Sequence, residues 1–153
     1  MGLFDSTEEH PPAKMMRYII TGVVFIVLVA LFAAYQLRFH NEEKTVRHFM
    51  DTIAAGNMDE AYRIWKPTQT YSFKDFLEDW GPNGYYGPIK SYHVDHVERM
   101  AAASGGEASG AVATIRVSPF QPFPDSHDEA KQNKTQEVRI WVQFKDQSLG
   151  FPP

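Results

Sequence analysis

The chain of 153 residues contains no cysteine. This absence excludes disulfide bonds, thiolate zinc sites, cysteine-ligated iron–sulfur clusters and cysteine nucleophiles. An excess of positive charge is missing as well, because 15 Lys and Arg residues stand against 19 Asp and Glu residues, for a net charge of -4. This balance argues against nucleic acid as a main partner, since proteins that bind nucleic acid carry positive charge to match the phosphate backbone.

The apolar residues are concentrated in one block of the chain. They make up 43% of all residues, yet the mean hydropathy is -0.38, which is that of a polar protein. Between Arg17 and Arg38, 17 of the 20 residues are apolar and none is charged. The chain therefore joins a segment suited to lipid with a remainder long enough for one small soluble domain. This length excludes a large multidomain enzyme.

The apolar block, Tyr18 to Leu37, predicts a transmembrane helix over residues 18–38. At about 1.5 Å per residue, its length matches the hydrocarbon core of a bilayer, which is about 30 Å thick. The alternative is a cleaved secretory signal, which has an apolar stretch of only about 7 to 15 residues and a small-x-small cleavage site. Bulky side chains stand two positions before Ala33 and Ala34. We therefore favour an uncleaved, single-pass signal-anchor.

Basic residues flank both ends of this segment, so their distribution does not decide its orientation. A single span so near the N-terminus usually leaves its short tail in the cytoplasm. We expect residues 1–17 to be a flexible cytoplasmic tail and residues 39–153 to lie on the periplasmic side of a bacterial inner membrane. Membrane lipid is an expected partner of the span. The soluble residues 41–153 carry a net charge of -4, which an anionic lipid surface would repel.

Residues 41–153 show helical periodicity first and strand periodicity afterwards. Apolar spacings of three, four and seven, together with two capping-box patterns, predict three helices, over Glu42–Ala55, Met58–Lys66 and Ser72–Trp80. Alternation of apolar and polar residues then predicts three strands, over Ile89–Met100, Ala111–Phe120 and Glu137–Lys145. Helices followed by strands are typical of an α+β fold, with the helices packed on one face of a curved antiparallel sheet.

One stretch of this domain resembles a known superfamily. The first predicted helix ends in AAGNMDEAY, an aromatic-rich short helix follows, and GPIKSYHV leads into the strands. This layout resembles the nuclear-transport-factor-two-like fold, a cystatin-like α+β cone, over about residues 42–149. Gly56, Ala61 and Tyr62 match its link between the first two helices. The resemblance implies a cone-shaped domain of the membrane-tethered bacterial group of unknown function, and it allows a homodimer that forms through the sheet.

Two side chains on the first strand are weak candidates for catalysis. His93 and Asp95 are two residues apart, so they share a strand face on which the carboxylate could orient the imidazole. Enzymes of the superfamily use an Asp or His inside the cone, so the resemblance allows this role. The favoured interpretation is an exposed polar strand edge. His93 and His96, three apart, are expected on opposite faces, and no metal or other cofactor site is predicted.

Aromatic residues are concentrated between Tyr62 and Tyr92, where nine of them fall within 31 residues. One interpretation is a pocket for a flat apolar ligand, and the favoured one is a core with an interface. Tyr85 and Tyr86 lie in the glycine- and proline-rich segment 81–88, which predicts a turn that presents both rings outward. Exposed tyrosines on a rigid turn are common interface anchors.

These features predict a non-enzymatic, single-span accessory or assembly subunit of a larger membrane complex, whose soluble domain makes protein–protein contacts with other membrane-protein subunits. Respiratory and photosynthetic complexes are candidate hosts. The alternative keeps the same fold and makes the domain a membrane-tethered module that binds a small molecule or transfers protons, as isomerases and dehydratases do.

Overall fold

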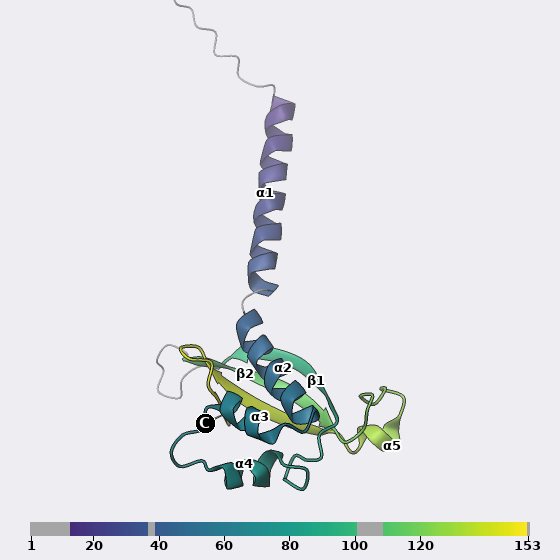
Figure 1. Cartoon of the computed structure of the whole chain (residues 1–153). Coiled ribbons are helices and arrows are strands. Elements are labelled where there is room, and N and C mark those ends of the chain that lie inside the picture. The colour runs from purple at the N-terminus through teal and green to yellow at the C-terminus, as the bar shows by residue number, and fades with distance from the viewer. Residues whose placement is uncertain (1–12, 37–38, 101–108, 153) are drawn as a thin grey trace, which may run out of the picture. The chain divides into compact units, whose positions relative to one another are not determined.

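The computed structural model describes residues 13–36, 39–100 and 109–152 (Figure 1). The chain divides into two compact units, Met1–Arg38 and Phe39–Pro153. In the first unit, α1 extends over Ala13–Gln36. Its stretch Met15–Ala34 has a mean hydropathy of 2.3, and none of the residues that define this value is buried.

The apolar helix is thus confirmed as long and apolar enough to cross a membrane, two properties that a signal sequence shares. The only polar side chain in its middle is Thr21, whose Oγ1 donates a hydrogen bond to the carbonyl oxygen of Arg17 at 2.9 Å, which satisfies the hydroxyl inside the helix. Residues 13–17 are helical, although the sequence predicts them as part of the tail. Residues 1–12 of that tail lie outside the described residues.

The second unit is an α+β domain with a four-stranded antiparallel sheet. Its elements follow in the order α2 (His40–Ala54), α3 (Met58–Trp65), α4 (Phe73–Trp80), β1 (Ser91–Arg99), β2 (Gly110–Ser118), α5 (Glu129–Gln132), β3 (Gln136–Gln143) and β4 (Leu149–Gly150). The strands lie in the order β1-β2-β3-β4, and every neighbouring pair is antiparallel. The α+β class and the three long strands are therefore confirmed, whereas the cone shape stays a prediction.

Side-chain caps mark the starts of α3 and α4, whereas the start of α2 has no side-chain cap. Asn57 accepts a hydrogen bond from the backbone N–H of Glu60 at the start of α3. At the start of α4, Ser72 and Asp75 form a complete capping box, in which each side chain accepts a hydrogen bond from the backbone N–H of the other residue. Gly56 follows α2 with φ = +80°, a conformation that favours glycine because it has no Cβ. The predicted helix boundaries therefore hold to within about two residues.

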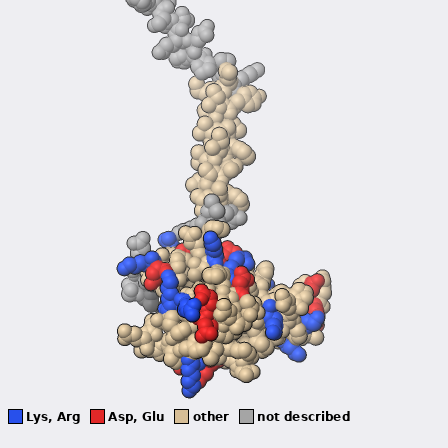
Figure 2. All heavy atoms as spheres, in the orientation of Figure 1, with Lys and Arg blue, Asp and Glu red and all other residues tan. Residues whose placement is uncertain are grey.

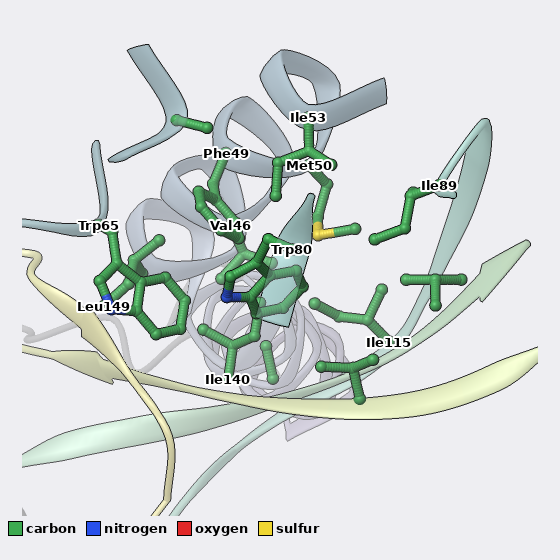
Figure 3. Close-up of a cluster of buried hydrophobic side chains, with 14 of the residues drawn as sticks. Val46, Phe49, Met50, Ile53, Trp65, Trp80, Ile89, Ile115, Ile140 and Leu149 are labelled. Carbon is green, nitrogen blue, oxygen red and sulfur yellow. The ribbon is translucent and has the colours of Figure 1, made fainter. Parts of the chain in front are cut away.

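Large side chains fill the layer between the helices and the sheet (Figure 3). Phe49 of α2 lies in the middle, with its ring centroid 5.1 Å from Trp65, 5.1 Å from Trp80 and 6.2 Å from Phe76. The sheet contributes branched residues from its central strands, and the largest fully buried side chains of this core are Trp80, Phe49, Phe76, Met50, Ile53, Ile115, Ile140, Val46, Val117, Val138 and Val142. Of the nine aromatic residues between Tyr62 and Tyr92, three are thus buried in the core and five more are partly buried against it.

Candidate functional site

His93 and Asp95 lie on the face of the sheet that points away from the helices. The pairing of β1 with β2 shifts between Val94 and His96, so Asp95 is an extra residue in a bulge. Because of this shift, His93 pairs with Arg116 and His96 with Thr114, two positions that share one face of β2.

The expectation that His93 and His96 lie on opposite faces is therefore wrong. The bulge also moves Val97 onto the core face, where it joins Val94 instead of the histidines. Among the described parts of the chain, no three His, Asp or Glu side chains gather in a way that could hold a metal ion.

The carboxylate of Asp95 is bound by Arg116 on the neighbouring strand. Arg116 Nε donates to both carboxylate oxygens at 2.9 and 3.0 Å, and Nη2 donates to Oδ1 at 2.8 Å. The guanidinium of Arg116 holds the pKa of Asp95 below its usual range, because its hydrogen bonds favour the charged carboxylate. His93 Nε2 is 3.7 Å from Oδ1, which is too far for a hydrogen bond.

This geometry makes Asp95 a partner of Arg116 more than of His93. The ring of Phe123, from the segment between β2 and α5, lies 5.7 Å from Arg116 Cζ and 6.0 Å from the centre of the His93 ring. It therefore covers one side of Arg116 and His93. His93 itself is 58% exposed. A carboxylate that orients a histidine base accepts a hydrogen bond from its ring, and Asp95 does not do so in this arrangement. The geometry instead indicates that the Asp95–Arg116 ion pair fixes the bulge of β1 against β2, and we call this ion pair the clamp.

We expect Asp95→Asn to lower the free energy of unfolding by at most about 1 kcal/mol, because both partners are partly exposed to solvent. The folded-state pKa of Asp95 is depressed, so its contribution is present above the unfolded pKa of about 4 and is lost as the pH falls through the folded pKa. Urea titrations between about pH 3 and 7 measure the free energy of unfolding at each pH. Its decrease toward low pH, the acid limb, should be smaller for Asp95→Asn than for the control Glu98→Gln. Identical acid limbs for both variants would contradict the clamp.

Tyr85 and Tyr86 lie on a turn that is held tightly against the end of α4. The backbone N–H of Tyr85 donates to the carbonyl oxygen of Glu78 at 2.8 Å, and that of Tyr86 donates to Asp79 at 2.9 Å. A Cβ on Gly84 would lie 2.8 Å from two backbone oxygens, so only glycine fits where the turn approaches the helix.

The two tyrosines of this turn differ in their surroundings. Tyr85 is 75% exposed and meets the ring of Tyr86 edge-on at 4.8 Å. Tyr86 is half-buried, with its ring 5.0 Å from Trp80. The expectation that both rings point outward is therefore wrong for Tyr86, because Trp80 lies beneath it and offers an aromatic surface on which it packs. Tyr85 is the exposed ring on a rigid support.

The sequence patterns miss Phe151, which follows the last strand. Its ring lies 5.3 Å from Trp65 and 6.1 Å from Trp80, and it is 41% exposed. Beside it, an open groove of about 300 Å³ is lined by Trp65, Thr68, Thr70, Tyr71, Leu149, Gly150 and Phe151. Burial raises the pKa of Tyr71, whose hydroxyl donates to Asp79 Oδ2 at 2.6 Å, so this hydroxyl is already engaged. The groove is shallow, aromatic and uncharged.

Comparison of the chain with protein-family models, with curated proteins and with solved structures finds no match. The resemblance to the nuclear-transport-factor-two-like superfamily therefore stays a prediction.

Proposed function

We propose that this protein is a single-span, non-enzymatic accessory or assembly subunit of a larger membrane complex, whose α+β domain contacts neighbouring subunits. Two features together support the proposal. The apolar helix has no buried residue in its most apolar stretch, and the interior of the α+β domain is filled by side chains. A helix of this kind needs lipid or other membrane helices around it.

The filled interior favours a contact role over the alternative of a ligand or proton-transfer domain. Binding pockets for small molecules are usually concave cavities of about 300 to 1,000 Å³ that enclose most of the ligand. In this domain Phe49, Trp80 and Phe76 are fully buried in the core between helices and sheet. The groove beside Phe151 supports the alternative, because its aromatic walls suit a flat apolar ligand, but it is open to solvent.

Tyr85 is the residue best placed to make the proposed contact. Interfaces are enriched in tyrosine, and their energetically dominant residues sit on supports that need little reordering. The turn around Tyr85 meets this condition through its backbone hydrogen bonds to α4. Over the viewed face of the domain, Lys and Arg side chains are interspersed with Asp and Glu (Figure 2), and such a surface without one dominant sign of charge suits a protein partner.

Photo-crosslinking in membranes tests this contact. With benzoylphenylalanine in place of Tyr85, we expect a discrete crosslinked species larger than 17.5 kDa. The same amino acid in place of Lys74, which is exposed on α4, serves as the control and should give at least about fivefold less product, because hot spots are localised.

Native gels after extraction in mild detergent give an independent readout. Migration of the chain as a lone 17.5 kDa species would overturn the accessory-subunit proposal. Binding of a quinone or other flat apolar molecule that the lone species retains would favour the alternative. Equal crosslinking from positions 74 and 85 would be compatible with a complex but would contradict the role of Tyr85 as its contact residue.

The proposed location is the inner membrane of a bacterium, with the α+β domain in the periplasm. A C-terminal reporter that is active only in the cytoplasm should stay inactive, and N-terminal sequencing of the membrane-bound chain should begin before Tyr18. A strongly active reporter would reverse the orientation. A first residue after position 34 would make the apolar helix a cleaved signal.

A further inference from the structure

The exposed face of α2 presents three basic side chains in a row. His40, Lys44 and His48 follow one another at intervals of four residues and are all exposed, so they lie along one stripe of the helix. They line an open hollow of about 380 Å³ together with Glu43, Arg47 and Asp51. This hollow is distinct from the tyrosine turn and from the polar face of the sheet, because none of those residues lines it.

The acidic side chains of α2 are engaged by partners within the domain. Glu43 accepts hydrogen bonds from Arg47 at 2.6 and 2.8 Å, and buried Glu42 accepts one from Gln147 at 3.2 Å. Asp51 accepts a hydrogen bond from Tyr92 at 2.7 Å. Burial raises the pKa of Tyr92 to about 12, so its hydroxyl stays a donor.

The basic side chains of the stripe, His40, Lys44 and His48, differ from these acidic side chains in their contacts. In the described ranges 13–36, 39–100 and 109–152, no residue forms a hydrogen bond or an ion pair with the side chain of His40, Lys44 or His48. The stripe therefore offers the imidazole N–H groups of His40 and His48 and the ammonium of Lys44 outward. The carboxylates beside it are hydrogen-bonded within the domain, Glu43 by the charged Arg47 and both Glu42 and Asp51 by uncharged donors. The donors of the stripe fit a phosphate group.

The position of α2 in the chain brings this stripe close to a membrane. α1 ends at Gln36 and α2 begins at His40, and four residues span at most about 14 Å. The headgroup layer on each side of a bilayer is about 5 to 8 Å thick. From His40 to His48 the helix advances by about 12 Å, roughly the size of a few headgroups. If α1 spans the bilayer, the short link between α1 and α2 keeps His40 within about 14 Å of the end of the span, a distance from which it can reach the lipid headgroups.

We propose that the stripe His40–Lys44–His48 binds the phosphate groups of anionic glycerophospholipids at the surface of the membrane that α1 enters. This inference rests on the proposed membrane anchor. The net charge of -4 on the domain does not prevent the contact, because charges beyond about 8 to 10 Å are largely screened at physiological salt. Headgroups next to the anchor are also held at high local concentration, so even a small number of charges produces a measurable bias.

A single fluorophore on the same face of α2 provides the test. The natural chain has no cysteine, so Ala55→Cys, which is exposed and three turns after Lys44, takes one label. The full chain is placed in nanodiscs that contain lipid with a spin-labelled headgroup as a quencher. We expect quenching to be about twofold stronger with 30% phosphatidylglycerol than with phosphatidylcholine alone, and the difference to shrink in 1 M salt.

Two triple variants separate a specific stripe from general charge. His40→Gln/Lys44→Gln/His48→Gln should abolish the lipid dependence. The control Lys74→Gln/Lys131→Gln/Lys134→Gln, which changes exposed residues of α4 and of the segment around α5, should keep it. All six residues are exposed, so far-UV circular dichroism should be unchanged in both.

Three results would overturn the inference. They are equal quenching in both lipids, an equal effect of the two triple variants, and loss of the effect in the control only. If the chain does not incorporate into nanodiscs at all, the anchor itself is wrong. If it incorporates but shows no lipid dependence, the anchor stands and the stripe alone is refuted.

Discussion

Phe49→Ala is expected to lower the free energy of unfolding of the domain by about 3 to 5 kcal/mol. The ring is fully buried and contacts Trp65, Trp80 and Phe76, so its removal deletes apolar contacts with both neighbouring helices at once. The close packing around the ring lets its neighbours fill the resulting cavity only in part. Since the free energy of unfolding of small domains is only about 5 to 15 kcal/mol, this single change removes a large part of it.

Urea unfolding of the full chain in detergent, followed by tryptophan fluorescence, measures this loss. Tyr85→Ala is the matched control, because it removes an aromatic ring that is 75% exposed and should change the free energy of unfolding by no more than about 0.5 kcal/mol. A loss below about 1 kcal/mol for Phe49→Ala would show that the interior is loosely packed. It would then favour the small-molecule alternative, because a loose interior leaves room for a ligand.

The helices of the domain can be predicted because their boundaries are encoded locally. Asn57 and Ser72 cap α3 and α4 through hydrogen bonds to residues only three positions away, and Gly56 ends α2 through its own backbone freedom. Nothing distant in the sequence is needed to form these features. For the same reason the length and composition of α1 are evident from 20 consecutive residues.

The faces of β1 could not be predicted, although its length could. A period of two holds only while every residue pairs, and the bulge at Asp95 inserts one residue that no partner opposes. The ion pair that accompanies the bulge comes from Arg116 on a different strand, 21 positions further along. Periodicity within one strand carries no record of such a partner. The relation between His93 and His96 was therefore beyond the sequence pattern.

Short elements and single contacts were missed for a similar reason. β4 has two residues, which is too few to show a period, and its place is set by pairing with Trp141 and Val142 of β3. Phe151 then packs on Trp65, which is far away in the sequence. In the candidate contact site, the exposed position of Tyr85 follows from the turn residues, whereas the burial of Tyr86 depends on Trp80 beneath it.

Phe25→Arg together with Leu28→Arg is expected to release the chain from the membrane. Each arginine near the middle of a membrane helix costs about 2.5 to 3.5 kcal/mol of insertion free energy, whereas each large apolar residue contributes only about 0.3 to 0.6 kcal/mol. The two changes together therefore offset most of what the whole apolar stretch supplies. Both side chains are exposed in α1, so no packing within the chain compensates.

Carbonate extraction of membranes measures the release, with Phe25→Leu/Leu28→Phe as the control that keeps the helix apolar. The double arginine variant should move from the pellet to the soluble fraction by at least about tenfold, and the control should stay in the pellet. Retention of the arginine variant would contradict the prediction, because alkaline carbonate releases proteins that are bound only at the membrane surface, so the helix would still span the bilayer.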